Sequence, residues 1–172
     1  RLAGAKTAAA NNLVQGLPFE LIIQRMVDAG VASQVDENRA ANALGGWTYT
    51  PAINLEQEFS PGVINSIISG GWIYALHAAE EEMGGRGVYV NNRLKNRMAN
   101  NLYYAQNTDG GPRYSILSND SIFSVVGNYL PACKWLGWDK WDPSDESDAG
   151  YPFIELTKGQ ARQVYDRYLQ YV

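Results

Sequence analysis

Helix-start and helix-stop signals recur along this chain, and the apolar residues between them repeat at spacings of three and four. The clearest example begins at Thr157, which matches a capping box with Gln160. Behind this box the apolar residues follow at helical spacing: Ala161, Val164, Tyr165, Tyr168 and Leu169. A segment with one apolar face has to pack against other elements, so the pattern predicts a helical domain.

Further segments carry the same kind of signal: residues 19–29, 33–44, 61–83, 91–106 and 119–130. Their expected boundaries are capping residues, glycines and prolines, among them Gly30, Ser33, Gly45, Ser60, Pro61, Gly84, Gly110 and Pro131. Residues 47–59 alternate only briefly and include Pro51, which predicts an extended connection or an edge strand. The sequence therefore predicts one all-α domain, residues 1–172, of five or six short helices.

Length and composition agree with a domain that folds alone. With 172 residues, 45% of them hydrophobic, the chain can bury a core without covalent cross-links. Its one cysteine, Cys133, excludes an intrachain disulfide and so gives no indication of the compartment. A net charge of −4 argues against a general nucleic-acid-binding protein, whose surface is basic.

Charges of opposite sign are separated along the sequence. Residues 139–148 carry five acidic residues and one lysine, whereas residues 86–113 carry five basic residues and one aspartate. In the simplest interpretation both are solvated faces. The alternative is complementary docking, in which the two patches orient neighbouring subunits or a partner.

Three tryptophans, Trp135, Trp138 and Trp141, lie three residues apart beside the acidic stretch. In a helical turn this spacing places side chains near one face, so we expect the indoles to form one aromatic ridge. Such a ridge either closes a core or contacts a partner, because Trp is enriched in interface hot spots. The tryptophans are therefore candidate partner-binding residues, with Trp138 at the centre of the contact.

The basic region supplies the other candidate partner-binding residues, Arg93, Arg97, Tyr103 and Tyr104. Tyrosines beside arginines could stack on single-stranded nucleic acid. The net negative charge of the chain and its small number of cations favour a protein interface, where Tyr and Arg are also enriched.

Nucleophilic catalysis of the Ser/His or Cys/His type would depend on His77, the only imidazole. His77 lies in a stretch expected to be a buried helix, where a structural histidine is the commoner outcome. It could also serve as an axial ligand to haem, but no motif supports that role. One cysteine and one histidine are too few for a zinc site of the Cys/His type.

The acidic stretch alternates oxygen donors at Asp142, Ser144, Glu146 and Asp148. The calcium-loop pattern requires Gly and Glu at positions where this chain has Ser147 and Phe153, so the match fails. We therefore predict no metal and no cofactor.

Paired carboxylates are the main enzymatic alternative. Glu80, Glu81 and Glu82 form a run at an expected helix end, and tryptophan-rich surfaces stack against sugar rings. The same run is also typical of a solvated helix terminus. The sequence does not show whether two of these carboxylates face each other.

No membrane span is predicted. The most apolar window, residues 63–79, is short for a span and is interrupted by Asn65, Gly70, Gly71 and His77. Peripheral association with a membrane stays open. The start at Arg1 suggests a processed mature chain, organellar or exported, although the compartment is otherwise not indicated.

These observations favour a non-catalytic helical accessory or structural subunit over an enzyme. We expect it to dock other protein subunits in a larger assembly, such as an organellar or membrane-associated complex or a virion. The alternative is a small glycan-active hydrolase that uses paired carboxylates beside the tryptophans.

Overall fold

The computed structural model describes residues 16–36, 44–48 and 64–172. These residues form five α-helices and two 3-10 turns: α1 (Phe19–Ser33), α2 (Ser66–Met83), η3 (Gly84–Arg86), α3 (Asn92–Tyr104), α4 (Phe123–Trp135), η4 (Trp138–Lys140) and α5 (Lys158–Tyr171). In the described part there is no β-strand, only isolated bridges. The all-α prediction is confirmed.

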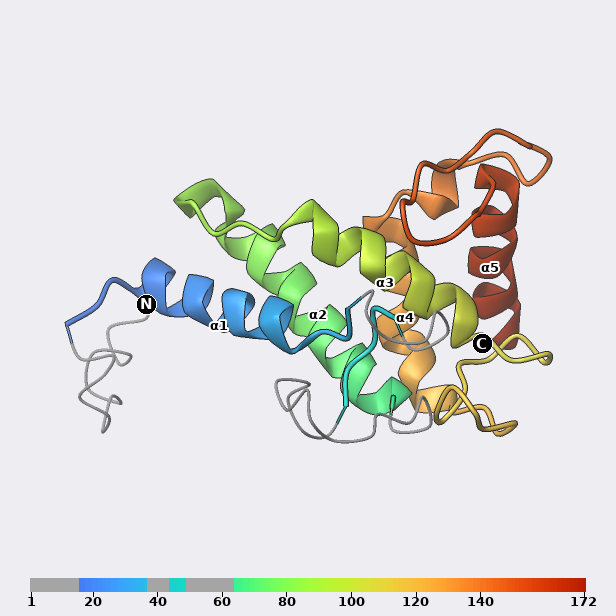
Figure 1. Ribbon diagram of the computed structural model, residues 1–172, viewed down its shortest axis with the longest axis horizontal. Coiled ribbons are helices and arrows are strands. Elements are labelled where there is room, and N and C mark those ends of the chain that lie inside the picture. The colour runs from blue at the N-terminus through green and yellow to red at the C-terminus, as the bar shows by residue number, and fades with distance from the viewer. Residues whose placement is uncertain (1–15, 37–43, 49–63) are drawn as a thin grey trace.

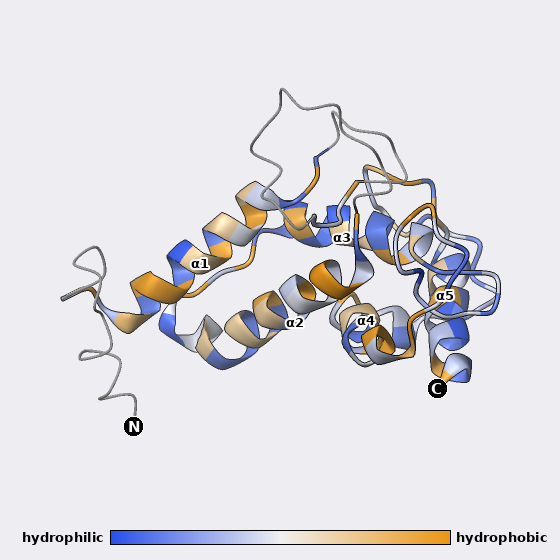
Figure 2. Ribbon diagram, turned by 90° about the horizontal axis from the view of Figure 1, so that it is seen from below, coloured by the Kyte–Doolittle hydropathy of each residue, from blue (hydrophilic) through white to orange (hydrophobic). Residues whose placement is uncertain are grey.

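The helices pack in two layers. Figure 2 shows α1 and α3 lying over α2 and α4, and both views place α1 and α5 at opposite ends of the domain (Figure 1). The contact between α2 and α4 is the most extensive, and α4 also packs against α5, α3 and η4. Their shared core is formed by fully buried side chains such as Ile73, Leu94, Met98, Leu102, Tyr129, Trp138 and Tyr168.

The central helix α3 buries polar side chains that hold a neighbouring segment against it. Asn100 of α3 donates from Nδ2 to the carbonyl of Leu44 at 2.9 Å. Gln34, which follows α1, donates from Nε2 to the carbonyls of Gly45 at 3.0 Å and of Leu94 on α3 at 3.2 Å. A Cβ on Gly45, which has a φ of +86°, would collide with the carbonyl oxygen of Arg97. Only glycine therefore allows this close approach of two backbones.

Two expected helix boundaries are confirmed by their caps. At the start of α5, Thr157 Oγ1 accepts from the N–H of Gln160 at 3.1 Å, and Gln160 Oε1 accepts from the N–H of Thr157 at 2.9 Å. The helix expected over 91–106 is α3, and the Asn91 side chain accepts from the N–H of Arg93 at its start.

The expected stop at Gly30 is wrong, because α1 continues through it to Ser33. Gly30 is there for packing: a Cβ at this position would lie 2.7 Å from the ring of Trp72 on α2. Ser33 was expected to cap the next helix, but it is the last residue of α1 and donates from Oγ to the carbonyl of Gly30. Most of the helix expected over 33–44 lies outside the described residues.

Pro131 was expected to end a helix that begins near Asn119, yet α4 begins at Phe123 and continues through Pro131 to Trp135. Proline removes the N–H that the carbonyl of Gly127 would accept. Gly127 is exposed and Pro131 only part-buried, so this carbonyl stays accessible to water. The proline is tolerated because it lies on the outer side of the helix.

The expected helix start at Ser60 and Pro61 lies outside the described residues. As described, α2 begins at Ser66, where Asn65 Oδ1 accepts from the N–H of Ile67 at 2.8 Å. Of the connection expected over 47–59, only Trp47 and Thr48 are described. Trp47 is buried and donates from Nε1 to the carbonyl of Gly30 at 2.9 Å.

Candidate functional site

The three tryptophans do not form one ridge. Trp135 is the last residue of α4, Gly137 then takes a φ of +80°, and Trp138 opens η4. Trp141 follows with extended backbone, φ −84° and ψ 152°. Because α4 ends before Gly137 and the backbone leaves the helical conformation there, the spacing of three does not correspond to one helix face.

Trp138 belongs to the protein's own core. Its side chain is 0% exposed, and its Nε1 donates to the hydroxyl of Tyr151 at 2.6 Å. Burial raises the pKa of Tyr151 to about 12, although the hydrogen bond from Trp138 opposes this. The ring of Trp141, which is part-buried, lies 6.4 Å from that of Tyr151. Trp138 therefore offers no exposed surface to a partner in the described structure, and its role at the centre of a docking contact stays an untested prediction that this burial does not support.

Trp135 joins a small network between α2, α3 and α4. Its Nε1 donates to Glu80 Oε2 at 2.7 Å, and Lys95 Nζ lies 2.6 Å from the same oxygen. Lys95 Nζ also lies 4.7 Å from the centre of the Trp135 ring, in cation-π geometry. Burial raises the pKa of Glu80, but the hydrogen bonds from Lys95 and Trp135 outweigh it, so this pKa lies below its ordinary value of 4.5.

This network limits what the glutamate run can do chemically. Glu80 is held as an anion, whereas glycoside hydrolysis needs one carboxyl that stays protonated. Glu81 and Glu82 are exposed, and Glu81 Oε2 lies 4.0 Å from His77 Nε2. Glu80 is therefore not suited to act as a general acid.

Cys133 is fully buried, and this burial raises the pKa of its thiol. The thiolate is the reactive form of cysteine, so burial makes Cys133 a poor nucleophile. It packs in the core as a small apolar residue.

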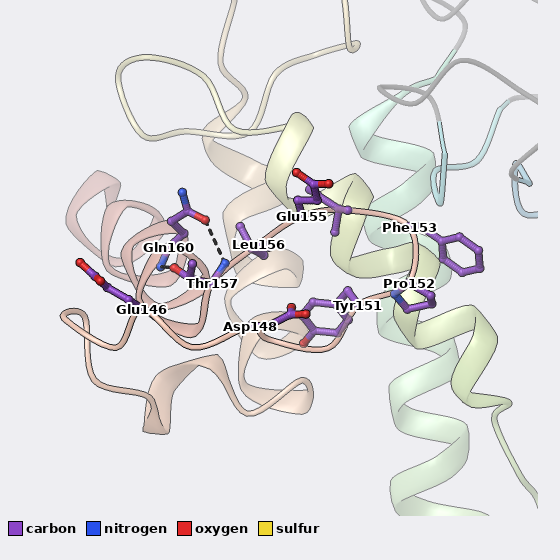
Figure 3. Close-up of a pocket in the computed structure, with 10 residues that line it drawn as sticks. Glu146, Asp148, Tyr151, Pro152, Phe153, Glu155, Leu156, Thr157 and Gln160 are labelled. Carbon is purple, nitrogen blue, oxygen red and sulfur yellow. Dashed lines mark hydrogen bonds between the residues drawn. The ribbon is translucent and has the colours of Figure 1, made fainter.

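A pocket of about 640 Å³ lies at the loop that follows the tryptophans. Its lining includes the carboxylates of Glu146, Asp148 and Glu155 and the rings of Tyr151 and Phe153. Figure 3 shows the three carboxylates spread around the loop rather than paired, with Glu146 and Glu155 far apart on its rim. All three are exposed, so the surroundings do not exclude water from them.

The acidic residues of this loop shape its backbone. Asp142, Asp145 and Asp148 each accept a hydrogen bond from the N–H two residues later, at 2.8, 2.9 and 2.8 Å. Such Asx turns hold a loop without regular secondary structure. Hydrogen bonds from Ser144 and Ser147 lower the pKa values of Asp142 and Asp145. In the described residues, no three His, Cys, Asp or Glu side chains are grouped so that they could hold a metal ion.

Most cations of the basic region are engaged within the protein. Arg86 pairs with Glu20 at 3.3 Å, and Lys95 pairs with Glu80. Arg113 donates to the carbonyls of Gln106 and Ser118. The predicted basic surface is therefore less available for docking than the sequence indicates.

The two arginines chosen as partner-binding candidates differ. Arg97 is buried, and this burial lowers its pKa although the charge of Asp36 opposes the shift. Arg93, at the start of α3, is exposed. Only Arg93 is placed where a partner could reach it.

The tyrosine pair, Tyr103 and Tyr104, lies at the C-terminal end of α3 and is open to solvent. The two residues are 37% and 36% exposed, and their rings meet edge to face at 5.2 Å and 88°. In the described part of the chain, neither hydroxyl has a hydrogen-bond partner. Among the aromatic candidate residues, Tyr103 and Tyr104 are therefore the two whose rings and hydroxyls a partner could contact.

The site contains one feature that sequence reasoning missed, the network of Glu80, Lys95 and Trp135. Its members are 15 and 55 positions apart, so no local pattern connects them. The acid at position 80 and the lysine at 95 are visible in the sequence, but their pairing depends on how α2, α3 and α4 pack.

No protein family, curated protein or solved structure matches this chain. Among residues 16–36, 44–48 and 64–172, no helix has both the length and the apolar character needed to cross a membrane.

Proposed function

We propose that this chain is a non-catalytic helical subunit that docks onto another protein of a larger assembly through the tyrosine pair. The observation that carries the proposal is the exposure of two adjacent aromatic rings whose hydroxyls are unpartnered in the described residues. A tyrosine offers apolar contact area and a hydrogen-bonding tip at a low entropic cost. A rigid helix end that presents two of them is suited to a protein interface.

A protein partner fits this surface better than a nucleic acid. Two rings at 88° to each other do not form a flat platform on which successive bases stack. The nearby cations Lys95 and Arg113 are engaged with Glu80 and with backbone carbonyls, so they offer little charge to phosphates.

The test uses the full chain in an extract of the cells that make it. We expect the protein to sediment in a complex well above its own mass of 19.0 kDa, and the double substitution Tyr103→Ser with Tyr104→Ser to release it as a monomer. Tyr74→Ser is the matched control, because Tyr74 is 62% exposed on α2 and away from the pair. A wild-type protein that sediments as a monomer contradicts the proposal, as does a double variant that stays in the complex.

A glycan-active hydrolase remains the second candidate, favoured by the loop pocket that combines carboxylates with Tyr151 and Phe153. It predicts release of reducing sugar from soluble oligosaccharides and loss of that activity in Asp148→Asn or Glu155→Gln. The exposure of these carboxylates is the reason that we rank it second.

A further inference from the structure

A groove of about 450 Å³ crosses the outer face of α4. On this face Gly127, Leu130 and Lys134 lie three and four residues apart, turned away from the buried Tyr129 and Ala132. Figure 2 shows α4 between α2 and α5, and these two helices form the walls. The volume is in the range of small-molecule sites, which is about 300–1,000 Å³.

The two ends of the groove differ in chemistry because α5 runs antiparallel to α4. The ring of Tyr168 lies 5.7 Å from that of Tyr129, and Arg162 Nη1 donates to the carbonyl of Asp139, beyond the end of α4. Tyr165 is therefore nearer the C-terminal end of α4 than Leu169 is. His77 lies at this same end, 5.0 Å from the ring of Trp135.

Hydrogen-bond donors collect at the end of the groove near Trp135. Lys134 is exposed, and within the described residues its ammonium has no ion-pair partner. The hydroxyl of Tyr165 has no hydrogen-bond partner there either, although Arg162 lies over its ring. His77 adds an imidazole, whose Nε2 lies 4.0 Å from Glu81 Oε2. A cation and further donors in an apolar lining are complementary to an anion.

The other end of the groove is apolar. Leu130 and Leu169 line it, and Leu169 is 51% exposed. Beyond them the rings of Phe123 and Tyr171 lie 6.1 Å apart and continue the apolar surface. A molecule that fills the groove would therefore meet donors at one end and hydrocarbon along the rest.

We propose that this groove binds one molecule of a single-chain amphiphilic carboxylate of the fatty-acid type. Its carboxylate pairs with Lys134 and accepts from Tyr165 or His77, and its chain lies along Leu130 and Leu169. At the C-terminal end of α4 the carbonyls of Ala132 and Lys134 accept from the N–H groups of Leu136 and Gly137 at 3.1 and 2.9 Å, which weakens the repulsion of a carboxylate by this helix end.

Gly127 gives the groove its depth and also provides the sharpest test. Outside its own helical turn, no atom lies within 4 Å of the position where a Cβ would be added, so there is open space at the start of a larger side chain. Gly127→Leu fills the floor of the groove, and its better helix propensity keeps α4 folded. A far-UV circular dichroism spectrum and thermal unfolding like those of wild type show that loss of binding in this variant does not result from unfolding.

The experiment is calorimetric titration of the full chain with decanoate, decanol and decyltrimethylammonium, each below its micelle concentration. We expect decanoate to bind at one molecule per chain and Gly127→Leu to weaken it more than about ten-fold. Lys134→Gln should weaken decanoate about five-fold, as expected for an exposed ion pair, and leave decanol unchanged. Lys140→Gln, an exposed lysine outside the groove, is the matched control and should change nothing.

The proposal is overturned if wild-type protein does not bind decanoate or if the cationic amphiphile binds as tightly. It is also overturned if Gly127→Leu binds decanoate normally. Vesicles of phosphatidylcholine with phosphatidylserine test whether the groove instead contacts the anionic headgroups and chains of a lipid surface. Binding to these vesicles without binding to decanoate would assign the groove to a lipid surface and overturn the free-ligand proposal.

Discussion

The segment from Trp135 to Trp141 and the tyrosine pair at the end of α3 are both clusters of aromatic residues, and they differ in what their polar atoms bind. Trp138 Nε1 donates to Tyr151, and Trp135 Nε1 donates to Glu80. The hydroxyls of Tyr103 and Tyr104 have no partner in the described residues. Aromatic side chains whose polar atoms are satisfied inside the protein contribute to folding, whereas unsatisfied ones at the surface are available to a partner.

The largest effect should come from removing the core member of the first cluster. Trp138→Ala deletes a fully buried indole, and substitutions of this kind lower the free energy of unfolding by about 3–5 kcal/mol. Urea denaturation followed by circular dichroism measures the loss. Tyr104→Ala, at an exposed position, serves as the control. A loss below about 1 kcal/mol for Trp138→Ala would contradict its assignment to the core.

The next effect concerns the polar atom of Trp138. Tyr151→Phe keeps the ring but removes the acceptor of the 2.6 Å hydrogen bond, which leaves a buried N–H unpaired. An unpaired buried donor costs about 1–3 kcal/mol of unfolding free energy. Tyr89→Phe is the matched control, because Tyr89 is exposed and its hydroxyl has no hydrogen-bond partner in the described residues. If the two substitutions have equal effects, the hydrogen bond to Tyr151 does not stabilise the core.

The same two regions show which parts of the fold local sequence patterns predict and which they do not. Local patterns predict the element itself where the apolar face and the cap lie within one segment, as for Thr157, Gln160 and the residues of α5. They misplace boundaries where packing decides. Helix α1 continues through Gly30, where the absence of a side chain leaves room for the ring of Trp72. Helix α4 continues through Pro131, because the proline lies on the outer side of the helix.

The candidate residues follow the same logic. The exposure of Tyr103 and Tyr104 fits their selection from sequence, although their role in docking stays a proposal. The burial of Trp138 depends on Tyr151, 13 residues away across an irregular loop, and on a glycine with positive φ at 137. The spacing of three between the tryptophans indicates neither this contact nor this turn. The sequence alone therefore could not show that the three indoles do not form one ridge.

A third prediction concerns Trp135 and uses the pH dependence of stability to test its hydrogen bond to Glu80. Because the pKa of Glu80 is lower in the folded protein than its ordinary value of 4.5, its contribution to stability is present above that pH and is lost as the pH falls through the folded pKa. Glu80→Gln leaves Lys95 unpaired and should lower the free energy of unfolding by about 1 kcal/mol at neutral pH. It should also remove this part of the acid dependence.

Denaturation of wild type and Glu80→Gln at several pH values between neutral and acidic gives both quantities. Glu82→Gln is the matched control on the same helix, since Glu82 is exposed. The free energies of unfolding of wild type and Glu80→Gln, plotted against pH, should converge as the pH falls. Curves that stay parallel at all pH values would show that the carboxylate of Glu80 does not anchor Trp135 through its charge.

The smallest effect on folding should come from the tyrosine pair, and that is what distinguishes it from the tryptophans. Tyr103→Ser and Tyr104→Ser remove exposed rings without breaking a hydrogen bond in the described residues, so each should change the free energy of unfolding by less than about 0.5 kcal/mol. Their edge-to-face contact lies at the surface, so its coupling energy should also stay below about 0.5 kcal/mol, which a double-mutant cycle would isolate. If the double variant loses as much stability as Trp138→Ala, the pair belongs to the core and the docking proposal loses its main support. If folding is unchanged while the complex is lost, the same two substitutions separate an interface from a core within one chain.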